Sequence, residues 1–245
     1  MKKRTVKKEK KMIFAGIVAG GSGTRMKNAA MPKQFIRVLD KPIIIYTIEK
    51  FAEQRHIDEI YIGIKPDWHA VMDQLLEEYG IDRSRVKVID GGSDRNDTVM
   101  KIVAAVKNEF DIKKGDIIIT HDAVRPFLTD TMIEENIIGA LKYSACGTYL
   151  KCVDTVVSSQ NGETIDSSLD RSTLYRAQTP QSFDITLLDK YYSELDETKK
   201  ARLTDTCSIF TESGHKIHIV EGDTVNIKIT TDSDLIIAKL LATRV

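Results

Sequence analysis

The chain has little of what three large classes of protein require. It holds only three cysteines in 245 residues, and Cys146, Cys152 and Cys207 have neither a disulfide-scaffold spacing nor a metal-ligand spacing. We therefore expect reduced thiols and a cytoplasmic protein. No apolar run reaches the length of a membrane-spanning helix, which predicts that the chain has no membrane partner. Internal repeats and low-complexity segments are also missing.

The formal net charge is zero, but the charged residues are distributed unevenly along the chain. Residues 1–11 carry seven Lys or Arg against one Glu, which leaves 29 basic and 35 acidic residues in the rest. This balance predicts a disordered basic tail over residues 1–11 and a single domain over 12–245 that binds no nucleic acid. The tail and the next apolar run resemble a signal peptide. However, the run is short, and cleavage there would destroy the turn that follows.

That turn is the most informative part of the chain. An unbroken apolar run, residues 12–18, is typical of a strand buried on both faces of a parallel sheet. Gly20, Gly21 and Gly23 then turn the chain, and backbone N–H groups freed by such a turn can bind phosphate oxygens. Arg25 and Lys33 add positive charge nearby. The combination predicts a polyphosphate site.

The two best-known glycine motifs do not fit this turn. A dinucleotide fingerprint requires glycine where Met26 stands, and a Walker A loop requires lysine where Ser22 stands. The Gly-Gly-x-Gly-Thr-Arg-Met turn followed by Pro-Lys instead resembles the signature of sugar-nucleotide pyrophosphorylases and their relatives.

Strands and helices alternate through the first half of the chain. Hydrophobic periodicity predicts helices over 42–52 and 68–79, strands over 59–64, 86–89 and 116–120, and a helix that follows a second glycine-bearing turn at 90–98. Parallel strands end at one sheet edge, so Asp122 should lie beside both turns, where a carboxylate can hold Mg²⁺ or a sugar hydroxyl. His121 is compatible either with a general base or with a structural, hydrogen-bonded histidine.

From residue 144 onward the alternation is less regular. We predict a strand over 148–157, a turn at 160–162 and an extended segment to 176, together a hairpin arm at about 146–180 of the kind that serves dimers. Helices are predicted over 187–195 and 203–212, and strands over 216–220 and 226–230. A final helix begins near Asp232.

Six motifs in order resemble one enzyme family. They are Ala19–Met26, Pro32–Gln34, Gly91–Arg95, His121–Pro126, Gln178–Gln181 and Asn226–Lys228. Together they are similar to cytidylyltransferases that act on methylerythritol 4-phosphate, in isoprenoid synthesis, or on ribitol 5-phosphate, in wall teichoic acid and capsule synthesis. The resemblance implies a Rossmann-like, three-layer α/β nucleotidyltransferase core with a mostly parallel sheet. A β-arm would protrude from it and be exchanged in a homodimer. The reaction would convert CTP and a polyol phosphate into a CDP-polyol and pyrophosphate, with Mg²⁺ as cofactor.

The resemblance also implies roles for individual residues. Catalytic cations would be Arg25, Lys33, Arg171 and Lys228. CTP would be bound by Val18, Ala19, Gly20, Gly21, Gly23, Thr24, Gly92, Ser93, Asp94, Arg95, Asn96, Asp97 and Thr98. The polyol phosphate would be bound by Asp122, Arg125, Thr155 and Thr179, with Asp122 also a candidate metal ligand. Arg171 and Thr155 would reach in from the partner subunit. Because the substrate phosphate is itself the nucleophile, no Ser, Cys or His nucleophile is required.

The acceptor is left open between two polyol phosphates. The segments 203–207, 120–124 and 226–231 favour the ribitol branch, whereas 144–151 departs from both branches. Methylerythritol 4-phosphate is the alternative, and a hexose-1-phosphate nucleotidyltransferase is a more distant one. A nucleotide-binding regulator on the same scaffold is the non-enzyme alternative, although a pure binder has no need of cations that stabilise a transition state.

Overall fold

The structure, a computed structural model, describes residues 10–21 and 31–243. Most of the predicted tail and the second half of the first glycine turn, with Gly23, Thr24 and Arg25, lie outside the described residues.

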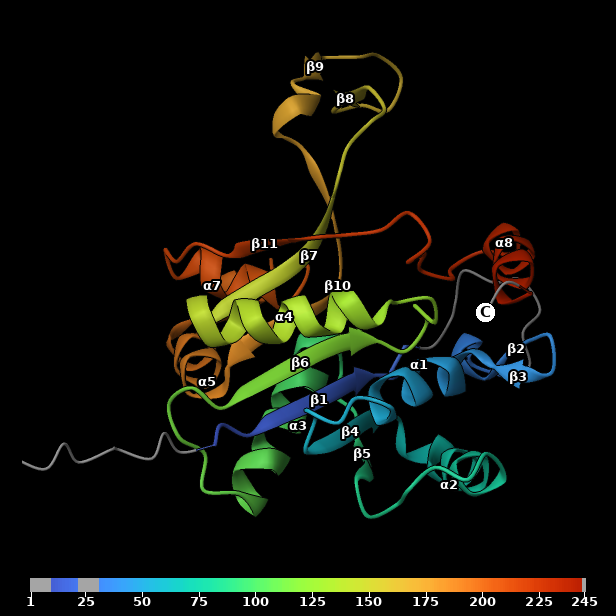
Figure 1. The fold of residues 1–245 in the computed structure, drawn as a ribbon. Helices are drawn as coiled ribbons and strands as arrows, with labels where there is room; N and C mark the ends of the chain where they lie inside the picture. Colours follow the sequence, from blue (N-terminus) through green and yellow to red (C-terminus); the bar gives the residue numbers. More distant parts are fainter. Residues whose placement is uncertain (1–9, 22–30, 244–245) are drawn as a thin grey trace, which may run out of the picture.

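The described chain forms a seven-stranded sheet, two small ribbons and helices on both sheet faces (Figure 1). The strands are β1 (Ile13–Val18), β2 (Arg37–Val38), β3 (Lys41–Pro42), β4 (Glu59–Ile64), β5 (Val86–Asp90), β6 (Ile117–Asp122), β7 (Ala145–Lys151), β8 (Val156–Ser158), β9 (Ser167–Leu169), β10 (Tyr175–Asp184) and β11 (His218–Glu221). The α-helices are α1 (Ile43–Ala52), α2 (His69–Glu78), α3 (Arg95–Glu109), α4 (Asp130–Tyr143), α5 (Ile185–Glu194), α6 (Glu197–Lys200), α7 (Cys207–Glu212) and α8 (Asp232–Ala242). Short 3₁₀ turns are η1 (Lys33–Phe35), η2 (Pro66–Trp68) and η3 (Arg171–Thr173).

The large sheet is mainly parallel. Its strand order is β11-β7-β10-β6-β1-β4-β5, in which β10 runs antiparallel to both its neighbours. The strands β6, β1, β4 and β5 are parallel, so their carboxyl ends meet at one edge. The predicted α/β class with a mostly parallel sheet is confirmed.

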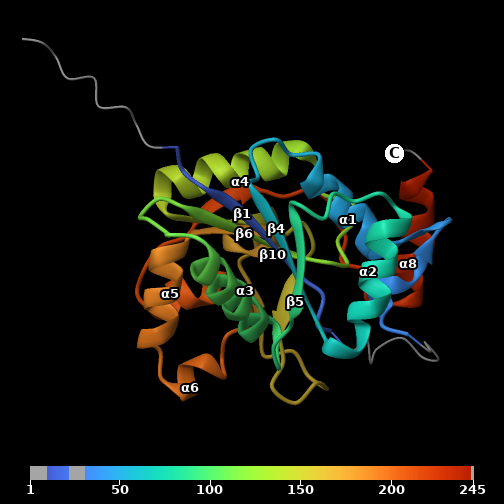
Figure 2. The same cartoon turned by 90° about the horizontal axis from the view of Figure 1, so that it is seen from below.

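Side-chain alternation along β1 explains the three layers. Ile13, Ala15 and Ile17 point to one face and pack with α1, α2 and α4. Phe14 points to the other face and packs with α3, α5 and α7. Figure 2 shows α4 on one side of the sheet and α3 and α5 on the other. Both faces are covered, which is why the strand sequence is apolar throughout.

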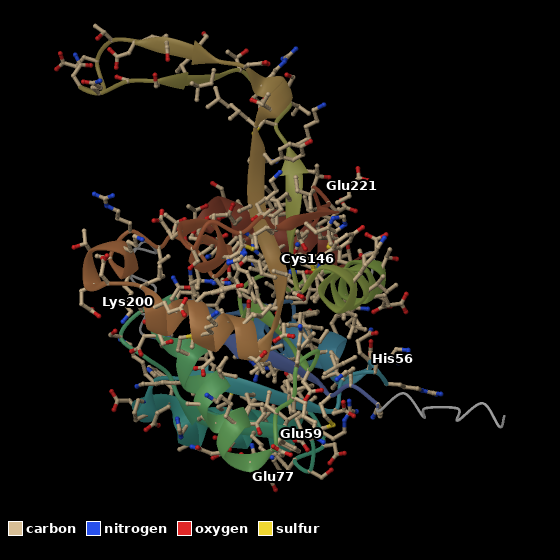
Figure 3. The ribbon with its side chains drawn as sticks, turned by 90° about the vertical axis from the view of Figure 1, so that its left-hand side faces the viewer. His56, Glu59, Glu77, Cys146, Lys200 and Glu221 are labelled. Carbon is tan, nitrogen blue, oxygen red and sulfur yellow. The ribbon has the colours of Figure 1, made fainter. Side chains whose placement is uncertain are left out.

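A two-stranded arm leaves the sheet beyond β7 and β10. These strands are paired from the sheet outward, and the chain between them forms the β8–β9 ribbon at the far end of the arm (Figures 1 and 3). The predicted strand over 148–157 is wrong in its bounds, because the chain leaves β7 after Lys151 and pairs again only at Val156. The turn at 160–162 is stabilised by Asn161, whose Oδ1 accepts from the backbone of Glu163 and Thr164.

Several elements differ from the prediction. The segment 226–230 is not a strand: it pairs with no described strand and instead crosses the carboxyl edge of the sheet. The helix expected over 203–212 begins only at Cys207, and α3 begins three residues before Thr98, with Asp94 as its N-cap. Hydrophobic periodicity did not predict α4, and only residues 175–180 of β10 lay within the predicted arm. Cys146 lies in the interior (Figure 3), and the three cysteines are free. No helix within residues 10–21 and 31–243 is long and apolar enough to cross a bilayer.

The packing of α3 on β4 generates a prediction. A Cβ atom at Gly63 would lie 2.4 Å from Cγ2 of Thr98. We expect Gly63→Ala to lower the free energy of unfolding by about 1–3 kcal/mol, the usual cost of overpacking. Urea denaturation measures the change. Gly21→Ala is the matched control, since no described atom lies within 4 Å of its added Cβ. Equal stability of the two variants would contradict this packing.

Candidate active site

A pocket of about 250 Å³ lies at the carboxyl edge of β1, β4, β5 and β6. Most of the described residues that the resemblance assigns to CTP line it: Val18, Ala19, Gly20, Gly21, Gly92, Ser93, Asp94, Arg95 and Thr98. Lys33, Asp122 and Lys228 line it too. Ligands of open α/β sheets bind at this edge, so the pocket is the candidate active site.

The first glycine turn is fixed from two sides. The backbone N–H of Ala19 donates to the carbonyl of Gly63 at 2.9 Å, and Nε2 of Gln34 donates to the carbonyl of Ala19 at 2.6 Å. Gln34 is buried although it is polar, because this hydrogen bond satisfies its amide. Sequence reasoning assigned no role to Gln34, although its place beside Lys33 in the Pro-Lys-Gln motif could have suggested one.

The second turn is stabilised by the first residues of α3. The N–H of Gly92 donates to Oγ1 of Thr98 at 2.9 Å, and the N–H of Ser93 donates to Oδ2 of Asp97 at 2.7 Å. A Cβ at Gly92 would lie 2.4 Å from that carboxylate, so only glycine fits. Asn96 and Asp97, predicted to bind CTP, do not line the pocket. The carboxylate of Asp97 instead positions the turn, whereas Oδ1 of Asn96 accepts from Oγ1 of Thr206 at 3.3 Å.

Three cations surround the carboxylate of Asp122. Nε of Arg95 lies 2.9 Å from Oδ1, while Nζ of Lys228 and Nε of Arg125 lie 2.8 Å and 3.5 Å from Oδ2. The backbone N–H of Asp122 donates to Oγ1 of Thr179 at 3.1 Å. Burial alone raises the pKa of this carboxyl group, but Arg95 and Lys228 outweigh burial and hold the pKa well below its usual range. Asp122 is therefore ionised at neutral pH.

A second cavity, of about 190 Å³, adjoins this cluster. Arg125 and Thr179, both predicted to bind the polyol phosphate, line it together with Asp122 and Lys228. Arg95 lines both cavities, so the cluster stands between the two. The arrangement can hold a nucleotide on one side and a second phosphorylated ligand on the other.

Polar residues that sequence reasoning left without a role hold these cations. Nη1 of Arg95 donates to Oγ1 of the buried Thr206 at 2.6 Å. Nη1 of Arg125 donates to the carbonyl of Asn226 at 2.8 Å, and Nδ2 of Asn226 donates to the carbonyl of Thr179 at 2.8 Å. Asn226 lay in a quoted motif, whereas no sequence signal marked Thr206 as a partner of Arg95.

His121 has a structural role. Its ring is fully buried against Phe51, and Nε2 lies 3.0 Å from the carbonyl of Arg125, to which it donates. Burial lowers the pKa of His121 to about 4, with the adjacent cations acting in the same direction. The imidazole is neutral at pH 7 and positions the loop that carries Arg125. Of the two roles left open by the sequence, the structure supports the hydrogen-bonded histidine.

Two predicted site residues lie far from this pocket. Arg171 and Thr155 are exposed on the arm, and Nη1 of Arg171 donates to the carbonyl of Val153. Neither lines the pocket in this single chain. Gly23, Thr24 and Arg25 lie outside the described residues, so the structure does not place them.

The sequence predicts Asp122 as a candidate metal ligand. Within residues 10–21 and 31–243, no three His, Cys, Asp or Glu side chains gather around a common point. Both oxygens of Asp122 already face cations. A metal ion at Asp122 would have to compete with these ammonium and guanidinium groups, and the role of Asp122 as a metal ligand stays a prediction.

The sheet, the two turns at its carboxyl edge and the buried cation cluster define an α/β nucleotidyltransferase. The sequence matches the profile of the IspD family, 2-C-methyl-D-erythritol 4-phosphate cytidylyltransferase, over residues 13–244. The chain belongs to this family, and it is a CTP-dependent cytidylyltransferase. The family resemblance drawn from the six motifs is thereby confirmed.

Solved structures agree with this assignment. The 4-diphosphocytidyl-2C-methyl-D-erythritol synthase of Anaerococcus prevotii is 29% identical, with a TM-score of 0.79 over 96% of this chain and 97% of that one. The 2-C-methyl-D-erythritol 4-phosphate cytidylyltransferase of Francisella tularensis is 25% identical, with a TM-score of 0.77 over 94% and 99%. The Thermus thermophilus enzyme of that name, 23% identical with a TM-score of 0.73 over 96% and 100%, shows the same fold.

The buried His121 predicts a pH dependence of stability. In the unfolded chain His121 takes up a proton near its ordinary pKa of 6.5, whereas the folded chain resists protonation down to about pH 4. Stability is therefore lost as pH falls from about 6.5 towards 4. Between pH 7 and pH 5 the wild type should lose about 2 kcal/mol more than His121→Gln, which cannot titrate but can donate to the same carbonyl.

Urea denaturation at the two pH values measures this difference. Asp122 does not affect this comparison, because a carboxyl group with a lowered pKa loses its contribution to stability only below about pH 4. Parallel losses in the wild type and the variant would show that His121 is protonated in the fold.

Proposed function

We propose that this chain transfers the cytidylyl group of CTP to a small polyol phosphate. A phosphate oxygen of the acceptor attacks the α-phosphorus of CTP, a new P–O bond forms, and the bond to the β-phosphate oxygen breaks, so that pyrophosphate leaves. The observation that carries the proposal is the cluster around Asp122. It places Arg95 and Lys228 on both the cavity at the glycine turns and the adjoining cavity, and it places Arg125 on the adjoining cavity.

Catalysis then rests on positioning and charge. Cations fixed before the reaction stabilise negative charge that builds up in the transition state, and each is worth about 3–4 kcal/mol when removed singly. Lys33 would act on the α-phosphate and the leaving pyrophosphate, and Arg25, predicted for the same role, lies outside the described residues. Lys228 and Arg125 would orient the acceptor phosphate, which carries the nucleophilic oxygen itself.

We also propose that Mg²⁺ binds to the site together with the nucleotide. Mg²⁺ binds phosphate oxygens and keeps much of its water shell. The ion is therefore expected to arrive with the triphosphate of CTP rather than to be held by Asp122, whose oxygens are paired.

The names of the similar proteins support methylerythritol 4-phosphate as the acceptor. The Francisella tularensis enzyme is named for 2-C-methyl-D-erythritol 4-phosphate, and the Anaerococcus prevotii enzyme is named for 4-diphosphocytidyl-2C-methyl-D-erythritol, the product of cytidylyl transfer to that acceptor. On this basis the chain would act in isoprenoid synthesis.

One observation favours ribitol 5-phosphate as a second candidate. The segments that resemble the ribitol branch come together at the acceptor side of the cluster. Thr204 and Asp205 line the adjoining cavity, Nε2 of Gln181 donates to Asp205 at 2.6 Å, and Thr206 holds Arg95. Residues at these positions contact an acceptor or the groups that bind it, so their type bears on which polyol is accepted.

The partner subunit and the location of the protein are also part of the proposal. The exposed arm would be exchanged in a homodimer, and Arg171 and Thr155 would enter the partner's acceptor site from it. The chain would work in the cytoplasm. A nucleotide-binding regulator is less compatible with the cluster, because three cations on one buried carboxylate are costly to maintain for binding alone.

The test is pyrophosphate release from CTP and Mg²⁺ with ribitol 5-phosphate and methylerythritol 4-phosphate in parallel. We expect rapid release with one of them and a loss of more than about a hundredfold in turnover for Lys33→Ala, with unchanged thermal unfolding. The preferred acceptor assigns the pathway. The absence of pyrophosphate release with both acceptors, or near-normal turnover of Lys33→Ala, would contradict the proposed function.

A further inference from the structure

Lys65 is a pocket residue to which neither the motifs nor the mechanism gives a role. It is the first residue after β4, which lies between β1 and β5 in the sheet. Lys65 therefore stands between the two glycine turns, and it lines the nucleotide pocket. Its side chain is exposed, and the described residues offer it neither a hydrogen bond nor an ion pair.

The backbone of Lys65 is set by local chemistry. Pro66 follows it and opens η2, and a residue before proline is restricted to extended conformations. Lys65 has φ −63° and ψ 141°, as this rule requires. The chain thus leaves β4 in a fixed direction, towards the sheet face that α1 and α2 cover.

An aromatic contact brings Lys65 to the same pocket wall as Lys33. Lys33 begins η1, which ends at the buried Phe35, and Lys65 is the N-cap of η2, which ends at Trp68. The rings of Phe35 and Trp68 pack with their centroids 5.2 Å apart. The two lysine-bearing turns are therefore joined, and both lysines line the nucleotide pocket.

The pocket needs more positive charge than its internal pairs supply. Asp122 offsets only one of the three positive charges around it, those of Arg95, Arg125 and Lys228, which leaves a net charge of about +2, and the carboxylate of Asp94 caps α3. A triphosphate brings several negative charges into this space. An ammonium group with three donors and no described partner is suited to phosphate oxygens.

We propose that Lys65 is a second phosphate-binding cation of the nucleotide site, acting beside Lys33 on the phosphate groups of CTP. The inference rests on the proposed function in so far as CTP is the nucleotide bound. A lysine that binds phosphate differs from one that contacts the base, because its contribution to the binding affinity must grow with the number of phosphates on the ligand. A lysine that binds phosphate also differs from a solvated surface lysine, because removing its charge weakens the binding of CTP.

Calorimetric titration of the full chain with CTP, CMP and cytidine tests this. Lys65→Ala should weaken CTP binding by about tenfold, the size of one charge-assisted hydrogen bond, and CMP binding by less. Cytidine binding should not change. The loss should shrink as salt is raised, and Lys65→Arg should retain most of the affinity.

Lys216→Ala is the matched control, since Lys216 is also exposed and lines neither cavity of the site. Fluorescence of Trp68, the only tryptophan in the sequence, reports whether the Phe35–Trp68 contact survives in each variant. Equal losses for cytidine and CTP would show that Lys65 contacts the base or ribose, and an unchanged CTP affinity would show a solvated lysine. Either result overturns the inference.

The design separates this inference from the proposed function. Binding is measured without an acceptor, so a wrong acceptor does not affect it. A wild type that fails to bind CTP overturns both. A wild type that binds CTP and releases pyrophosphate, alongside a Lys65→Ala variant with unaltered CTP affinity, overturns only the role of Lys65.

Discussion

A buried carboxylate is stable only where positive charge surrounds it, and Asp122 imposes this constraint on the whole carboxyl edge of the sheet. The strand β6 brings the side chain into the interior, where burial would otherwise favour its neutral form. Arg95, Arg125 and Lys228 keep it ionised. They come from α3, from the loop after β6 and from the crossing segment 226–230, so one charge joins parts of the chain that are far apart in sequence.

The remaining architecture holds those cations in place. Thr206, just before α7, fixes the far end of Arg95, and Asn226 fixes Arg125 through its carbonyl. His121 donates to the backbone of Arg125 from the buried side and stays neutral while doing so. The positive groups are therefore fixed before any ligand arrives. A site that must stabilise charge in a transition state benefits from this arrangement, because no reorganisation is needed during the reaction.

The sequence predicted what depends on local chemistry. Apolar runs located the parallel strands, and the glycine turns, together with Asp122 at the end of its strand, located the carboxyl edge where ligands bind. What it could not predict depends on tertiary contacts. The alternation of 226–230 suggested a strand, yet Asn226 and Ile229 are buried there by contacts with β10 and the loop after β6. The pairing of Thr206 with Arg95 spans 111 positions and has no local signature. The strand β10 contains Pro180 and polar residues, so its pattern did not resemble a central strand.

The contact between Asp122 and Lys228 makes the two residues one functional unit. A double-mutant cycle tests it most directly, with pyrophosphate release measured for Asp122→Asn, Lys228→Ala and the combined variant. If the carboxylate acts by holding the cation, each single substitution should cost about a hundredfold and the second should add less than about tenfold. Losses that simply multiply would contradict the account, because they would show that the carboxylate and the ammonium group act independently.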